Sequence, residues 1–173
     1  MLHRRNVSYN LRKLDSLFLV AIKKPKTYKL ANFYAKVAVL EACSWLENCI
    51  DKIFEDIYTT KLIVPGNKSD YKYILDRNYG FHYKENVRNK LSQNLFGLIH
   101  IEQIERKLNA EQVFNDMRGA LGSLKTVRDD LAHEHQSGSA INVQTVAQTK
   151  LYFEQAYEGL KLFEKEIKKI KFK

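Results

Sequence analysis

Apolar residues recur at steps of three and four along most of this chain, the spacing of one face of an α-helix. The pattern predicts helices over residues 6–22, 28–62, 82–98, 110–135 and 143–170. A shorter helix is expected at 69–75, and residues 99–108 are expected to be helical after a break. The sequence therefore predicts an all-α helical bundle of about five to six helices, with two long antiparallel core helices.

A length of 173 residues suits a single domain, and residues 1–173 are predicted to form one. Within it, residues 1–27 are interpreted as a helical N-terminal extension and residues 28–170 as the core. Residues 171–173 form a basic tail.

Composition narrows the possible folds and partners. Only 7 Gly and 2 Pro are present, too few for the frequent turns of an all-β fold. An apolar content of 45% is enough for a packed core and argues against disorder. The formal net charge of +9, from 29 basic and 20 acidic residues, favours a polyanionic partner, most often nucleic acid.

The cysteines and the apolar runs exclude other classes. Cys43 and Cys49 are six residues apart on one predicted helix, so they point about 120° apart and are too distant for a disulfide. They are interpreted as buried thiols in a reducing compartment, and no metal site is expected. No run reaches the 18 apolar residues of a membrane span, and no targeting segment stands out. A cytoplasmic protein without membrane contact is predicted.

The predicted helix at 110–135 has an apolar stripe about 140° wide when its positions are counted at about 100° per residue. The stripe is formed by Val113, Phe114, Met117, Ala120, Leu121, Leu124, Val127, Leu131 and Ala132. Arg128 and His135 fall inside it. A charged residue there is costly unless it is paired, hydrated or functional. A long arginine side chain near the end of a helix can also reach solvent, so this alternative stays open for Arg128. Asp129 and His133 are four residues apart on a polar flank, where they can meet.

The segment from Leu124 to His135 resembles the signature of HEPN domains, which are all-helical. That signature is an arginine, then a polar residue, with a histidine after four to six intervening residues. Arg128, Asp129 and His133 match it, and His135 also lies within the permitted spacing. The layout of residues 28–170 is similar to stand-alone bacterial HEPN families of defence or toxin–antitoxin systems, including the RiboL-PSP-like branch. The HepT group has a tyrosine two positions after the histidine, where this chain has His135.

The resemblance implies a metal-independent endoribonuclease that cleaves single-stranded RNA without a cofactor, acting as a toxin or defence effector. It implies a homodimer with a composite site, in which Arg128 and His133 are catalytic and Asp129 and His135 are supporting. Attack of the RNA 2′-hydroxyl would give a cyclic phosphate. A cognate antitoxin or nucleotidyltransferase is an expected partner.

The chemistry of the residues fits such a site. A histidine that titrates near neutral pH can move a proton, and an arginine can stabilise charge on a phosphate. Arg128 and His133 point about 140° apart on one helix, so two antiparallel copies would bring them together better than one chain.

Basic residues near the motif are expected to contact RNA phosphates. They are Lys84, Arg88, Lys90 and Lys125. Two alternatives stay open: a non-catalytic helical module that binds RNA or a protein, and a purely structural helical interaction domain.

Overall fold

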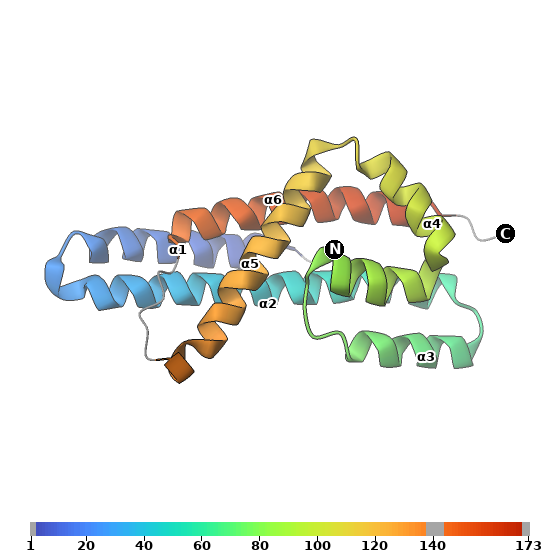
Figure 1. Cartoon of the computed structure of the whole chain (residues 1–173), viewed down its shortest axis with the longest axis horizontal. Coiled ribbons are helices and arrows are strands. Elements are labelled where there is room, and N and C mark those ends of the chain that lie inside the picture. The colour runs from blue at the N-terminus through green and yellow to red at the C-terminus, as the bar shows by residue number, and fades with distance from the viewer. Residues whose placement is uncertain (1–2, 138–143, 171–173) are drawn as a thin grey trace.

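A computed structural model describes residues 3–137 and 144–170, without the side chains of residues 25, 28 and 133–137. Within these residues the chain forms six α-helices and no strand, which confirms the predicted all-α bundle (Figure 1). The helices are α1 (Arg5–Ile22), α2 (Tyr28–Lys61), α3 (Pro65–Asp76), α4 (Gln93–Leu108), α5 (Gln112–Ser137) and α6 (Val146–Lys168). A 3-10 turn (Pro25–Thr27) and a π-helix (Tyr83–Ser92) complete the fold.

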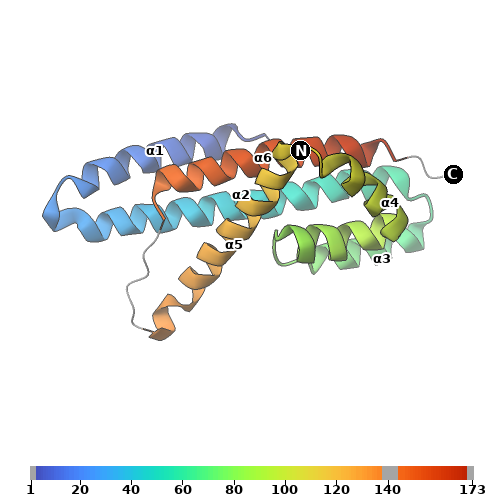
Figure 2. The same ribbon diagram turned by 45° about the horizontal axis from the view of Figure 1, so that its top comes forward.

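The long helices make an elongated layer that α5 crosses. Helices α1 and α2 form an antiparallel hairpin around the 3-10 turn, and α6 lies along them (Figures 1 and 2). Helix α5 passes obliquely over α2 in the opposite general direction, and its C-terminal end projects away from the bundle (Figure 2). The π-helix, α3 and α4 gather at the C-terminal half of α2 (Figure 1). The crossing of α2 and α5 places the motif helix against the centre of the longest helix.

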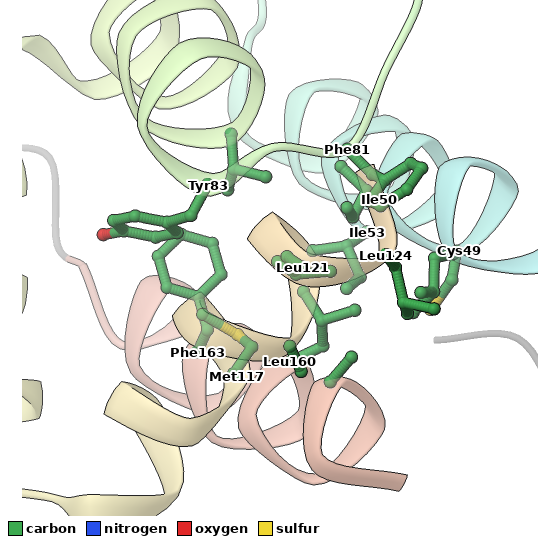
Figure 3. Packing of buried hydrophobic residues seen from close by; sticks show 14 of the residues in the cluster. Cys49, Ile50, Ile53, Phe81, Tyr83, Met117, Leu121, Leu124, Leu160 and Phe163 are labelled. Atoms are coloured by element: carbon green, nitrogen blue, oxygen red, sulfur yellow. The ribbon is translucent and has the colours of Figure 1, made fainter. Parts of the chain in front are cut away.

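One hydrophobic core joins α2, α5 and α6, because each helix turns its apolar stripe inward. Figure 3 shows residues of this core, among them Ile50 of α2, Leu121 of α5 and Leu160 of α6. The side chains of Phe114, Met117, Ala120, Leu121 and Leu124 on α5 are all buried. Val113 was expected in the same stripe, but 43% of it is exposed. The stripe of α5 is therefore a core face from residue 114 to residue 124.

Glycine allows α5 and α6 to approach closely. A Cβ atom at Gly159 of α6 would lie 2.2 Å from the Cβ of Met117 and 2.9 Å from the backbone oxygen of Val113. Gly119 and Gly122 of α5 have nothing within 4 Å of such an atom. The close contact between these two helices thus depends on a glycine in α6 and not on the two in α5.

The largest differences from the predicted helix boundaries are at the start of α3 and within residues 82–98. Pro65 occupies the first turn of α3, where its fixed φ and missing N–H are tolerated, so α3 starts there and not at residue 69. The single helix predicted over 82–98 is instead the π-helix followed by the start of α4. Gly97 interrupts α4 with φ 75° and ψ 163°, a backbone conformation that strongly favours glycine.

Candidate functional site

Arg128 lies where the core face of α5 meets the surface. Its side chain is 25% exposed and pairs with Glu47 of α2 through Nη1. Its guanidinium also lies 5.0 Å from the ring centroid of Phe81, which is fully buried, in a cation–π contact. The sequence left open whether this arginine is paired or snorkels. The structure shows that it is paired, with one side toward the core and one toward solvent.

Asp129 and Lys125 extend the ion pairs along α5. The Nε and Nη2 atoms of Arg128 each lie 3.3 Å from Asp129 Oδ1, and Lys125 Nζ lies 2.7 Å from Asp129 Oδ2. Partial burial acts to raise the pKa of Asp129, but Lys125 and Arg128 outweigh it and hold that pKa below its usual value. Asp129 is thus an ionised carboxylate that holds two cations beside each other.

Burial also acts on Arg128. It tends to lower the pKa of the guanidinium, but Glu47 and Asp129 outweigh it and the pKa is raised. An arginine with such a pKa is a permanent positive charge and cannot serve as a general acid. Its chemical capacity is to donate hydrogen bonds to an anion and to stabilise negative charge.

The side chains of His133 and His135 lie outside the described residues. The backbone of α5 runs through both positions to Ser137, on the end of the helix that projects from the bundle (Figures 1 and 2). Arg128 lies five residues before His133 on this same helix. The structure therefore places the motif on one continuous helix, as predicted.

The basic residues predicted to contact RNA differ in their surroundings. Lys84 is exposed. Arg88 Nε lies 2.9 Å from Glu105 Oε1, and Lys90 Nζ donates to the backbone oxygen of Arg77. Lys125, Arg88 and Lys90 thus each hold a contact within the chain, which a phosphate would have to displace or share.

A cleft of about 700 Å³ opens beside the Arg128–Glu47 pair. Carboxylate, amide and aromatic side chains of α2 and of the segment around residue 78 line it. They include Trp45, Glu47, Asn48, Asp51, Asn78 and Tyr79. The ring of Tyr79 is exposed and that of Trp45 packs on α6, 5.8 Å from the ring centroid of Tyr157. Four carboxylates line the cleft, those of Glu47, Asp51, Glu55 and Asp76, against the single cation of Lys52, so the cleft is acidic.

Asp51 is an unusual carboxylate in this cleft. Burial raises its pKa to about 6; the Asn78 side chain acts against this, and Glu47 and Asp76 act with it. Its Oδ1 atom is buried and has no hydrogen-bond partner among the described residues. A carboxyl group with such a pKa exchanges a proton in the range where many enzymes use acid–base groups.

The cysteines are structural. Cys43 and Cys49 are buried and form no disulfide. Burial raises the pKa of the Cys43 thiol to about 12, so this residue is not a nucleophile. Within residues 3–137 and 144–170, no cluster of three or more His, Cys, Asp or Glu side chains has the arrangement of a metal site. No helix in the same part of the chain is long and apolar enough to span a membrane.

Sequence reasoning found Arg128 but missed Glu47, its partner. The two residues are 81 positions apart, and only the crossing of α2 and α5 brings them together. The sequence does carry a weak indication of Glu47, because this carboxylate directly follows Leu46, which is buried in α2. Asp51 and Asn78 were also missed, because only the packing of the segment after α3 against α2 brings them together.

Comparison of the chain with protein-family models, with curated proteins and with solved structures finds no match.

Proposed function

We propose that this protein is a metal-independent endoribonuclease of the HEPN type, which cleaves single-stranded RNA at a site shared by two copies of the chain. The observation that carries the proposal is the placement of Arg128. Its guanidinium is held by Glu47 and Asp129 yet stays 25% exposed, five residues before a histidine on the same helix. A fixed and partly desolvated cation of this kind stabilises charge on phosphate more strongly than a mobile one.

In the proposed reaction, His133 accepts the proton of the ribose 2′-hydroxyl. The 2′-oxygen attacks phosphorus and the bond to the 5′-oxygen breaks, which leaves a 2′,3′-cyclic phosphate. The leaving oxygen takes a proton from a second acid, either His135 or a water molecule. Arg128 donates to the phosphate oxygens and stabilises the added negative charge.

An exposed apolar face supports the homodimer. Phe33 and Leu40 of α2 are 56% and 52% exposed. They precede Glu47 at seven-residue intervals, so all three positions lie on nearly the same side of the helix. Exposed large apolar residues in a row are typical of an interface. A second copy that packs on this face reaches the Arg128–Glu47 pair.

The proposed activity is tested with purified protein and a fluorescent single-stranded RNA in EDTA. We expect cleavage to a cyclic phosphate, with a loss of at least about 100-fold for Arg128→Ala or for His133→Ala. Arg106→Ala is the matched control, because Arg106 forms an exposed helical ion pair with Glu102 elsewhere. Parallel assay of His135→Ala decides which histidine acts. Cleavage that survives in the Arg128 and His133 variants would reject the site.

One observation favours a second function, that of a purely structural helical interaction domain. Arg128, Lys125, Arg88 and Lys90 are all engaged by groups of the same chain. Side chains held in this way suit a structural role. Absence of any RNA affinity at low salt, together with absence of cleavage, would favour this function.

A further inference from the structure

A second pocket, far along the sequence from the motif, lies between the start of α1 and the middle of α6. It has a volume of about 430 Å³. His3, Arg4, Arg5 and Arg12 line it from one side, and Glu154 and Tyr157 of α6 from the other. The two helices lie side by side in both views (Figures 1 and 2). With three arginines against one carboxylate, the pocket is basic.

Arg4 forms the wall of this pocket. Its guanidinium lies 4.2 Å from the ring centroid of Tyr157, pairs with Glu154 and reaches Glu158 at 3.8 Å. Lys161 Nζ, 3.0 Å from the same Glu158, neutralises that carboxylate further. The negative charges of α6 are therefore already balanced by cations of the same chain.

Arg5 and Arg12 are different, since neither forms an ion pair with a described residue. They are seven positions apart on α1, so they lie on nearly the same side of the helix about 10 Å apart along its axis. Two unpaired arginines on one side of a helix repel each other and favour binding of an anion.

Ser8 lies between these arginines and also lines the pocket. Its hydroxyl is buried and has no hydrogen-bond partner among the described residues. A buried hydroxyl without a partner is costly, and it can donate to an oxygen that enters the pocket. The first turn of α1 has no acidic residue and no side-chain cap, so its N–H groups add positive partial charge.

An aromatic ring that lines the cleft near Arg128 contacts an aromatic ring that lines this pocket. Trp45 lines the cleft, and its ring contacts that of Tyr157, which lines the pocket.

We propose that Arg5, Ser8 and Arg12 form a phosphate-binding subsite. It binds the backbone of the RNA strand at a position remote from the bond that is cleaved. This inference rests on the proposed ribonuclease function and gives residues 1–27 a role in binding substrate. Arginine suits it, because its fork of N–H donors matches phosphate oxygens.

The test measures binding of a 2′-O-methyl RNA, which lacks the attacking hydroxyl, by fluorescence anisotropy at several salt concentrations. Arg5→Gln/Arg12→Gln is compared with Lys23→Gln/Lys24→Gln, which removes the same charge from exposed positions at the other end of α1. Each lost phosphate contact lowers the slope of log Kd against log salt by about 0.7 for a single strand. We expect a fall of about 1.4 for the arginine pair and a much smaller change for the lysine pair.

Equal slopes for the two double variants would overturn the subsite. Cleavage of unmodified RNA by the wild-type protein is measured alongside. Cleavage together with equal slopes rejects the subsite and keeps the ribonuclease. Binding that depends on Arg5 and Arg12, without any cleavage, keeps the subsite and rejects the ribonuclease.

Discussion

At the scale of single residues, Arg128 shows how one side chain serves both the core and the surface. The aliphatic part of its side chain continues the apolar stripe of α5 after Leu124, and its guanidinium lies over the ring of Phe81. Glu47 and Asp129 balance its charge at the point where the stripe emerges into solvent. Arginine tolerates this position better than lysine, because its planar head stacks on rings and is weakly hydrated.

The pair formed by Arg128 and Glu47 should contribute measurably to stability. A double-mutant cycle with Arg128→Gln and Glu47→Gln should give a coupling free energy of about 1 kcal/mol or more, since both groups are partly buried. Urea unfolding of the four proteins measures it. The exposed pair of Lys72 and Asp76 on α3 is the control and should give less than about 0.5 kcal/mol. Equal coupling in the two pairs would contradict the role assigned to Arg128.

Asp51 should make stability depend on pH in the opposite way from most carboxylates. Its pKa in the folded protein, about 6, lies above its ordinary value of 3.8, so the folded state binds the proton more tightly. The contribution of Asp51 to the free energy of unfolding should therefore fall as pH rises from about 4 to about 6 and then stay level.

Asp51→Asn should remove that fall and stabilise the protein at pH 7 by about 1 kcal/mol, because partial exposure screens the charge. Urea unfolding at pH 4 and pH 7 tests this. Asp70→Asn, at an exposed position, is the control and should change neither value appreciably. If Asp51 instead makes the wild-type protein more stable at pH 7 than at pH 4, relative to Asp51→Asn, this prediction is wrong.

At the scale of helices, periodicity predicted most of the fold. The apolar pattern gave α2 to within one residue, because Pro25 precedes it and Pro65 follows it. Periodicity did not reveal the π-helix, since local winding depends on contacts that a 3.6-residue pattern does not encode. The break expected before residue 99 is present, at Gly97. Periodicity placed Arg128 on the correct face, but only the crossing of α2 and α5 brings Glu47 to it.

Gly159 should be essential to the packing of α5 on α6. Gly159→Ala places a methyl group 2.2 Å from Met117 Cβ, so the helices must separate, and we expect a loss of about 1–3 kcal/mol. Gly119→Ala is the matched control. It adds the same methyl group to a helix in open space, and it should stabilise the protein by about 0.5–1 kcal/mol. Thermal unfolding separates the two, and similar effects would show that the close approach is unimportant.

At the scale of the whole molecule, positive charge and apolar surface are arranged around the motif helix. The basic pocket at the start of α1 and the cleft beside Glu47 meet at Trp45. The exposed Phe33 and Leu40 lie on the side of α2 that leads to the same glutamate. A net charge of +9 would attract the proposed RNA substrate to the molecule as a whole, and the basic pocket would attract it most at the start of α1.

A site shared between two copies makes a quantitative prediction. Arg128→Ala and His133→Ala variants, each inactive alone, are unfolded together and refolded as an equal mixture. Half of the dimers then contain one chain of each kind. Each such dimer has one site with both Arg128 and His133 intact, so about a quarter of wild-type cleavage should return.

The same mixture with Phe33→Glu and Leu40→Glu in both chains should stay inactive, because two buried carboxylates would oppose the apolar contact between copies. Size measurement by light scattering should show these chains as monomers. Ile63→Glu, at a position 88% exposed on the loop before α3, is the control and should leave the regained activity unchanged. If the mixture without these substitutions forms dimers but regains no activity, each site needs both arginines or both histidines. That result would contradict a site made of one arginine and the histidine of the other copy.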